Sequence, residues 1–223
     1  LIPDLLKNGH EVISFDTKWF GDHLKFHKNL LNIKGDIRDT ESIPLDGVDS
    51  IIHLANIAND PSVDLNPTLS WEVNVLASNK LADKALKKEV KQIIFASSGS
   101  VYGIKNEPKV TEDLDLVPIS TYNKTKMVAE RVFLSYADKI KIHCIRPATV
   151  CGLSPRMRLD VSVNILTFQA LKNGKITVFG GQQTRPNIHI KDITNVYKHF
   201  LENRQIPSGC YNAGFENLSI IEI

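Results

Sequence analysis

Short apolar runs alternate along this chain with longer stretches of helical periodicity, and this alternation constrains the fold more than any other feature. Runs rich in Val, Ile and Phe predict strands at residues 11–16, 50–55, 92–97 and 141–147. Because these runs are apolar almost throughout, they indicate strands that are buried on both faces. The spacing of apolar residues predicts helices over 70–88 and 122–136. The chain is therefore predicted to be an α/β protein with a doubly wound parallel sheet.

The alternation of apolar runs and helical stretches becomes less regular after residue 150. Turn-forming residues occupy 152–155, and we predict a helix near 161–172 and a short strand near 176–179. These elements suggest a smaller, incomplete lobe over 151–223, interleaved with a first domain over 1–150.

Both ends of the chain resemble interrupted elements. Residues 3–8 look like the end of a helix that Gly9 caps in the left-handed conformation, and a helix is predicted to begin at Ser219. We therefore expect a chain that is truncated at both ends.

The charge and cysteine content exclude several classes of function. The 223 residues include 27 Lys and Arg against 25 Asp and Glu, a formal net charge of +2, which argues against nucleic acid or an anionic membrane as the main partner. No apolar run approaches the roughly 20 residues of a membrane span, and residues 1–10 lack a secretory signal, so we predict a cytoplasmic protein. Cys144, Cys151 and Cys210 are too widely spaced for a disulfide framework or a C-x-x-C metal site.

Several polar residues allow two interpretations. His23 and His27 could ligate a metal from one helix face, but no third spaced ligand follows, and we predict no metal site. His53 ends an apolar run, where a buried structural imidazole is favoured over a catalytic one. Arg156 and Arg158 are either contacts to an anionic ligand or solvated residues of a surface turn.

A serine cluster followed by a Tyr-x-x-x-Lys spacing carries the clearest chemistry. Ser97-Ser98-Gly99-Ser100 ends the apolar run 92–97, and Tyr122 and Lys126 begin the helix 122–136 on one helical face. A lysine charge beside a phenol favours the phenolate and lowers the pKa of the tyrosine from about 10, which makes it a general base. A nearby serine hydroxyl would orient a substrate hydroxyl or carbonyl.

These motifs belong to a longer ordered series. The series consists of Gly9-His10-Glu11-Val12 leading to Asp16, Gly35-Asp36-Ile37-Arg38-Asp39, His53-Leu54-Ala55, Val73-Asn74-Val75, Ser97-Ser98 with Val101-Tyr102-Gly103, Tyr122 with Lys126, Arg146-Pro147, and the segment 185–192. In order and spacing it resembles the extended short-chain dehydrogenase/reductases, and within them the NAD-dependent epimerase/dehydratase family that acts on nucleotide sugars. The resemblance implies a Rossmann-like fold.

The resemblance also implies a catalytic triad and an NAD site. Ser98, Tyr122 and Lys126 match the catalytic residues of the family. The residues that match cofactor-binding positions are Asp16, Asp36, Ile37, Leu54, Ala55, Asn74, Ser97, Tyr122, Lys126, Pro147 and Val150.

Asp16 decides which dinucleotide the resemblance implies. Its carboxylate would bind the adenosine ribose and would repel a 2′-phosphate, so NAD is expected as the cofactor. Lys18, Lys25 and Lys28 follow it and leave open a second interpretation, as phosphate contacts that favour NADP rather than a solvated basic loop.

The implied substrate is a nucleotide-diphosphate sugar, contacted by Ser98, Thr149 and Arg185. Arg185 matches the arginine that pairs with the diphosphate, whereas Thr149 stands where many relatives carry an asparagine. In the implied reaction Tyr122 takes a proton from a sugar hydroxyl, typically at C4, while hydride passes to NAD. An epimerase then returns the hydride to the other face of the keto sugar.

Three alternatives to epimerisation follow from the resemblance. Dehydratases of the family carry an Asp-Glu pair directly after the catalytic Ser or Thr, but Gly99 and Ser100 stand there in this chain and disfavour dehydration. Net oxidation or reduction of a nucleotide sugar stays open, and so does a non-catalytic relative that binds a nucleotide sugar. The family also implies a homodimer in which the two predicted helices form a four-helix bundle.

One family feature is not present in the sequence. The family holds the cofactor pyrophosphate on a glycine-rich turn at a helix N-terminus, and no G-x-G-x-x-G turn precedes residues 3–8. We therefore expect the domain over 1–150 to lack the first strand and this turn. A complete chain of this kind would bind NAD weakly.

Overall fold

The computed structural model describes residues 1–215 and 217–223, and its main sheet has four parallel strands. In spatial order these are β3 (Ser50–His53), β4 (Gln92–Ala96), β5 (Lys141–Pro147) and β8 (Gly209–Ala213). The first four residues of β4 are all buried, as are five of the seven residues of β5. The continuous apolar runs therefore predicted these two strands correctly.

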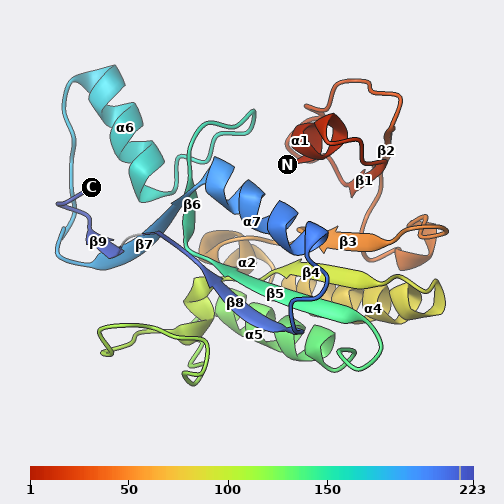
Figure 1. The fold of residues 1–223 in the computed structure, drawn as a ribbon. Coiled ribbons are helices and arrows are strands. Elements are labelled where there is room, and N and C mark those ends of the chain that lie inside the picture. Colours follow the sequence, from red (N-terminus) through yellow and green to blue (C-terminus); the bar gives the residue numbers. More distant parts are fainter. Residues whose placement is uncertain (216) are drawn as a thin grey trace.

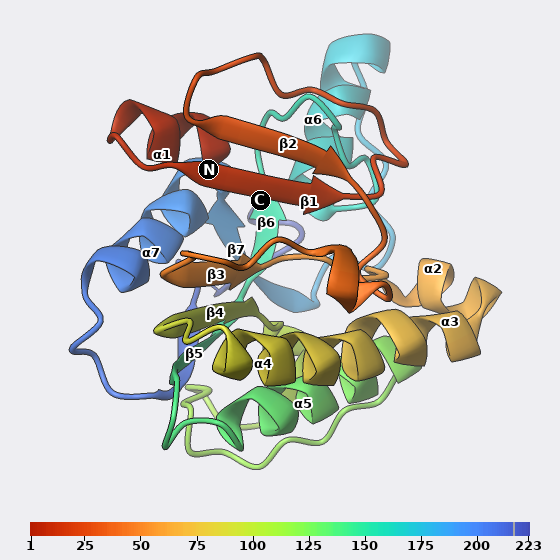
Figure 2. The ribbon, with the colours of Figure 1, turned by 90° about the vertical axis from the view of Figure 1, so that its right-hand side faces the viewer.

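A second, two-stranded parallel sheet pairs β1 (Val12–Asp16) with β2 (Leu30–Lys34). Figure 2 shows β1 between β2 and β3, although β1 and β3 are not hydrogen-bonded partners. The strand β2 was not predicted from the sequence. Its apolar residues are interrupted by Asn32 and Lys34, and Leu31 is half exposed, so the run lacks the pattern of a buried strand.

Helices cover both faces of the main sheet, which confirms the doubly wound α/β fold (Figure 1). The helices α4 (Ala77–Lys87) and α5 (Thr121–Leu134) lie on one face, and α7 (Ile190–Glu202) packs against β4 from the other. Short helices complete this part of the chain: α1 (Ile2–Lys7), η1 (Thr40–Ser42), α2 (Asp60–Leu65) and η3 (Gly99–Tyr102). Gly9 follows α1 with a φ of 85°, as the predicted left-handed cap requires.

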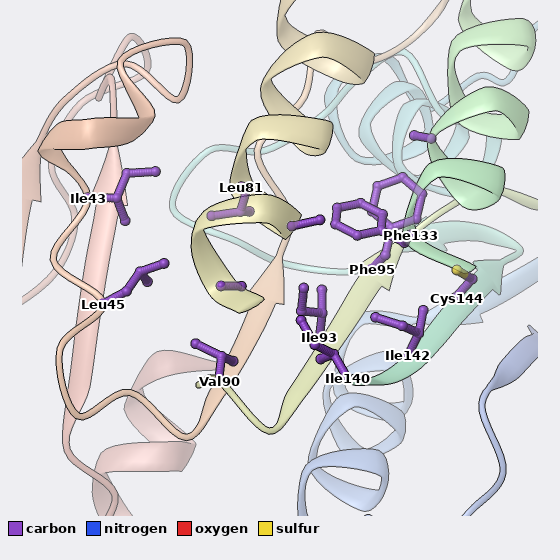
Figure 3. Close-up of a cluster of buried hydrophobic side chains, with 13 residues drawn as sticks. Ile43, Leu45, Leu81, Val90, Ile93, Phe95, Phe133, Ile140, Ile142 and Cys144 are labelled. Carbon is purple, nitrogen blue, oxygen red and sulfur yellow. The ribbon is translucent and has the colours of Figure 1, made fainter. Parts of the chain in front are cut away.

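The larger hydrophobic core lies between the main sheet and the helices α4 and α5 (Figure 3). Phe95 of β4 and Phe133 of α5 are fully buried there, with ring centroids 4.9 Å apart. A second cluster between the sheet and α7 includes Ile94, Ile145 and Tyr197. Burial of this apolar area holds the two helix layers to the sheet.

The helix predicted over 70–88 is a longer composite helix. It consists of α3 (Pro67–Trp71), a π-helical segment η2 (Glu72–Leu76) and α4. Asn66 begins it by accepting a hydrogen bond from the Leu69 amide at 3.0 Å. The π-helical segment places Asn74 in the interior, where its side chain binds the chain that follows β3.

Residues after 150 contribute to two different sheets. The strands β6 (Thr149–Cys151), β7 (Thr184–His189) and β9 (Asn217–Ser219) form a third sheet, beside which α6 (Ser162–Asn173) confirms the helix predicted near 161–172. The chain then returns to the first part of the molecule through α7 and β8.

Two predictions for this part of the chain were wrong. Residues 176–179 form no strand, because they lie in an exposed segment without a strand partner. Ser219 ends β9 instead of beginning a helix, and its hydroxyl binds the Glu222 carboxylate at 2.7 Å across a turn. In the described residues no helix is both long enough and apolar enough to cross a membrane.

Candidate active site

The parallel strands bring most of the predicted site residues to one edge of the sheets. Asp16 ends β1, Leu54 follows β3, Ser97 and Ser98 follow β4, and Pro147 ends β5. The carboxyl ends of parallel strands are where open α/β sheets bind their ligands. The start of α5 adds Tyr122 and Lys126 at the same edge.

The helix α5 starts where its sequence places a cap. Ser120 has an extended backbone, and its hydroxyl accepts a hydrogen bond from the Asn123 amide at 3.2 Å. Tyr122 is thereby held in the first turn, with Lys126 one turn later on the same face.

Three polar side chains of α5 bind the segment 96–100, which carries Ser98. Lys126 Nζ donates to the Ala96 carbonyl at 2.6 Å, and the Ser97 hydroxyl donates to Glu130 Oε1 at 2.5 Å. The Ser100 hydroxyl donates to Asn123 Oδ1 at 2.6 Å. Because residues 123, 126 and 130 share one face of the helix, α5 fixes the position of Ser98 from both sides.

The electrostatics around Tyr122 differ from the sequence-based expectation. Burial raises the pKa of Tyr122, while a hydrogen bond with Ser98 and the positive charge of Arg158 lower it. Lys126 is not among the groups that shift the pKa of Tyr122. Its ammonium group is directed to the Ala96 carbonyl and lies 4.8 Å from the centre of the Phe95 ring. The expected lowering of the Tyr122 pKa by Lys126 is therefore not found in this arrangement.

Lys126 is itself strongly affected by its surroundings. It is almost fully buried, and burial lowers its pKa to about 7, with the charge of Glu130 acting in the opposite direction. His53 is also buried, and burial together with the charge of Lys126 lowers the pKa of His53 to about 3. The His53 ring stays neutral and binds the Ser78 hydroxyl at 3.1 Å, which favours its structural interpretation.

Glu130 belongs to a buried polar network behind the serine cluster. Arg146 of β5 makes a bidentate pair with it, through Nε at 2.9 Å and Nη2 at 2.8 Å. Arg146 Nη1 donates to the Tyr102 hydroxyl at 2.7 Å, and that hydroxyl donates to Asn212 Oδ1 at 2.8 Å. With the Ser97 hydroxyl, the network joins the segment after β4 to η3, α5, β5 and β8 directly behind the candidate active site.

A cleft beside β1 collects four of the predicted cofactor residues: Asp16, Asp36, Ile37 and Ala55. Its walls also include Trp19 and Phe20. The combination of a carboxylate at a strand end with apolar and aromatic walls fits the adenosine half of a dinucleotide. Leu54 lies next to this cleft, and about half of its surface is exposed.

Asn74 acts on the cleft through the backbone. Its Oδ1 accepts from the Ile57 amide at 2.8 Å, and its Nδ2 donates to the Ile57 carbonyl at 3.1 Å and to Thr125 Oγ1 at 3.0 Å. The side chain therefore links the loop after β3 to α5.

The lysines that suggested NADP divide into two groups. Lys18 Nζ forms an ion pair with Asp22 at 2.6 Å, and the Lys18 backbone amide donates to Asp16 Oδ1 at 2.5 Å. The charge of Lys18 is therefore already paired with a carboxylate of the same loop. Lys25 and Lys28 lie further along the same exposed loop.

The loop 152–160 reaches from the third sheet across this edge. The Arg156 guanidinium lies 3.9 Å from the centre of the Phe20 ring, and Arg158 forms an ion pair with Asp160 at 2.6 Å. Asp160 also accepts a hydrogen bond from Asn59 at 3.2 Å. Both arginines have specific partners, and the charge of Arg158 acts on Tyr122.

The predicted substrate residues other than Ser98 are placed on the third sheet. Thr149 and Val150 belong to β6, and Arg185 lies on β7 with an exposed side chain. His23 and His27 make local hydrogen bonds to the backbone of Phe20 and Asn29.

Two residues that bear on the site were missed in the sequence: Asn123 and Glu130. Asn123 and Glu130 lie on the same helical face as Lys126, and that spacing could have identified them. Arg158 was named in the sequence as an anionic-ligand contact or a solvated residue, but its effect on Tyr122 was not predicted, because it depends on how the loop 152–160 folds back.

The sequence profile of the NAD dependent epimerase/dehydratase family matches residues 1–214. The chain belongs to the NAD-dependent epimerase/dehydratase family. It is accordingly an NAD-dependent enzyme, and its Rossmann-like fold is that of the extended short-chain dehydrogenase/reductases.

Individual relatives agree with this assignment. A UDP-glucose 4-epimerase of Lactobacillus helveticus is 27% identical, over 99% of this chain and 75% of its own. A protein of Bacillus subtilis described as an uncharacterized UDP-glucose epimerase, YtcB, is 33% identical, over 100% of this chain and 75% of its own. Among solved structures, MoeE5 in complex with UDP-glucuronic acid and NAD has a TM-score of 0.84 and 26% identity, over 98% of this chain and 73% of that chain.

Proposed function

We propose that this family member is an NAD-dependent nucleotide-sugar epimerase that works by transient oxidation of a sugar hydroxyl, at C4, to a keto sugar. The observation that carries this proposal is the attachment of α5 to the segment 96–100, which holds Ser98 next to Tyr122 at the carboxyl edge of the sheet. The UDP-sugar names of its relatives support a nucleotide-diphosphate sugar as the substrate.

Each residue of the triad has a distinct task in this proposal. Tyr122 takes the proton from the sugar hydroxyl as the general base. Ser98 makes a hydrogen bond that orients this hydroxyl. Lys126 donates to the Ala96 carbonyl at 2.6 Å and so holds the segment that carries Ser98. NAD, when bound, supplies the acceptor and later the donor of the hydride.

The cofactor would lie along the edge formed by β1, β3, β4 and β5. In this proposal Asp16 binds the adenosine ribose, and Asp36 and Ile37 flank the adenine. The loop with Leu54 and Ala55 lies beside the pyrophosphate and the ribose. Asn74 holds the loop after β3 near the cofactor. Ser97 and Lys126 lie on the cofactor side, and Pro147 and Val150 line the nicotinamide. The domain over 1–150 thus binds NAD, and the lobe over 151–223 contributes Arg185, which together with Thr149 contacts the sugar nucleotide.

Epimerisation is favoured over dehydration by the residues after Ser98. Dehydration needs an acid and a base for the loss of water, and Gly99 and Ser100 provide neither. A Cβ atom added at Gly99 would lie 3.2 Å from the Pro147 carbonyl oxygen, so a larger side chain there would need a shift of the backbone. A homodimer through the helices α4 and α5, and a cytoplasmic location, stay predictions of the sequence.

The proposal is tested by incubating the protein with NAD and UDP-glucose and analysing the sugar nucleotide by NMR. We expect conversion to the C4 epimer without accumulation of NADH. Tyr122→Phe should reduce kcat by about 10²- to 10⁴-fold, because it removes the general base. Tyr136→Phe is the matched control, since the Tyr136 hydroxyl binds Asp83 at the surface, and it should keep the activity.

Other results would direct the assignment elsewhere. Accumulation of NADH with an oxidised sugar would indicate a net dehydrogenase, and a deoxy keto sugar would indicate a dehydratase. Equal rates for Tyr122→Phe and the unaltered protein would contradict the proposal.

A further inference from the structure

The hydroxyl of Ser98 is the end of a short chain of hydrogen bonds. Ser98 Oγ lies 2.7 Å from Ser100 Oγ, and the Ser100 hydroxyl donates to Asn123 Oδ1 at 2.6 Å. The Ser100 backbone amide also donates to Ser98 Oγ at 3.2 Å. Asn123 is buried, and its position in the first turn of α5 is fixed by the Ser120 cap.

The number of protons in this chain determines its direction. An amide oxygen only accepts, so the single hydroxyl proton of Ser100 is used in the bond to Asn123. The short contact between the two hydroxyl groups then requires Ser98 to be the donor and Ser100 the acceptor. The single hydroxyl proton of Ser98 is therefore directed to Ser100.

We propose that Ser100 and Asn123 are positioning residues: they hold the hydroxyl proton of Ser98 on the side of Ser100, so that Ser98 faces Tyr122 and the substrate with its lone pairs. In this state Ser98 accepts a hydrogen bond from the neutral Tyr122 phenol or from a substrate hydroxyl. The role of this arrangement in catalysis rests on the proposed function. The direction of the hydrogen bonds does not depend on that function.

The direction of the chain has a consequence for the ionisation of Tyr122. Ser98 lowers the pKa of Tyr122 by donating a hydrogen bond to the phenolate, and it can do so only by giving up its bond to Ser100. Ser100 and Asn123 therefore compete with the phenolate for one proton. The other groups that act on Tyr122 are Arg158 from the loop 152–160 and Asp60 from α2. Tyr197 of α7 also faces it, because Tyr122 raises the pKa of Tyr197. None of these three residues belongs to this chain of hydrogen bonds.

The substitution Ser100→Ala tests this competition. It removes the acceptor of the Ser98 proton, so Ser98 becomes free to donate to the phenolate. We expect the titration midpoint of Tyr122 to fall by about one pH unit, the size of one hydrogen bond exchanged between the two protonation states. The midpoint is read from the NMR signals of the full chain labelled with ¹³C at tyrosine Cζ, with Tyr122 assigned through Tyr122→Phe.

Two further variants separate positioning from a merely structural role. Ser100→Thr keeps the hydroxyl and should leave the midpoint where it is in the unaltered chain. Asn123→Leu removes the final acceptor, lets Ser100 donate to Ser98, and should lower the midpoint in the same direction as Ser100→Ala. This second route gives the answer even if Ser100→Ala fails to fold.

Opposite results would overturn the proposal. A midpoint that stays the same or rises in Ser100→Ala and Asn123→Leu would mean that the bond to Ser100 does not withhold the Ser98 proton from the Tyr122 phenolate. Equal shifts in Ser100→Thr and Ser100→Ala would mean that packing, not the hydroxyl, sets the midpoint. Because the titration needs neither NAD nor a sugar nucleotide, its failure is distinct from failure of the proposed epimerase activity.

Discussion

At the scale of single residues, the site is built around a lysine that is difficult to keep charged. Lys126 is buried and has one hydrogen bond to a carbonyl, and its pKa is lowered to about 7. Between pH 7 and 10.5 the unfolded chain binds more protons at Lys126 than the folded chain does. The free energy of unfolding should therefore rise with pH across this interval, and below about pH 7 the full cost of burying the charge applies.

The variant Lys126→Met removes this contribution while keeping an unbranched side chain. We expect the difference in the free energy of unfolding between the unaltered chain and Lys126→Met to change by roughly 3 to 5 kcal/mol from pH 7 to pH 10.5, with the unaltered chain gaining stability relative to the variant. Urea unfolding at several pH values measures it. A difference that does not change with pH would show that Lys126 is not held in a desolvated position.

The pair between Glu130 and Arg146 is the second residue-scale feature with a measurable cost. Glu130→Gln leaves the buried guanidinium of Arg146 without a counter-charge and should destabilise the chain by about 3 to 5 kcal/mol. The double variant Glu130→Gln/Arg146→Met should recover most of this loss, as measured by urea unfolding. Asp46→Asn, which breaks an exposed pair with Lys88, is the control and should have little effect. A double variant as unstable as the single one would contradict the ion-pair explanation.

At the scale of elements, the sequence predicted where the catalytic helix begins but not what its side chains bind. Tyr122 and Lys126 carry a local signal, namely helical spacing, and the Ser120 cap found in the structure agrees with it. The bond from Lys126 to the Ala96 carbonyl joins two elements that are 30 residues apart, and no local pattern specifies it. The helix was therefore predictable, whereas the electrostatics of Tyr122 were not.

The loop between η3 and α5 depends on one glycine. Gly103 has a φ of 73°, and a Cβ atom added there would lie 2.2 Å from the Val117 carbonyl oxygen. Gly47 has a similar φ of 74° with no atom within 4 Å of an added Cβ. An alanine at either position would therefore have the same unfavourable backbone conformation. Only at Gly103 would its Cβ atom also clash with the Val117 carbonyl oxygen.

We expect Gly47→Ala to cost about 1 kcal/mol and Gly103→Ala to cost about 2 to 4 kcal/mol, measured by thermal or urea unfolding. The larger loss reflects displacement of the loop 104–120, which precedes the Ser120 cap. Equal losses in the two variants would show that the close approach at Gly103 is relaxed without cost.

At the scale of the whole molecule, the strands are divided between one strongly buried sheet and two smaller ones. The apolar runs predicted β4 and β5 because both faces of these strands are covered by helices. The strand β2 was not predicted, because polar residues interrupt its apolar run. The apolar residues 176–179 were wrongly predicted as a strand, because they are exposed in the structure. The sequence thus predicted β4 and β5 with the helices α4 and α5, but it missed β8 and α7, although α7 buries Ile193, Tyr197 and Phe200. It missed the third sheet because β6 and β9 have only three residues each and β7 is mostly exposed.

This division predicts unequal local stability. Within the described residues, the strands β1 and β2 pair only with each other, and a two-stranded sheet is marginal unless other elements support it. In hydrogen exchange we expect the amides of β4 and β5 to be protected more strongly than those of β1 and β2. Equal protection in the four strands would show that the two sheets unfold as a single unit.

The most direct test of the central claim uses a nucleotide sugar that carries deuterium on C4. If Tyr122 removes the hydroxyl proton and the carbon passes its hydrogen as hydride to NAD and back, the C4 epimer should keep the deuterium in water. Mass spectrometry and NMR of the product measure this retention. Exchange of the label for solvent hydrogen, or epimerisation at a carbon other than C4, would contradict the account.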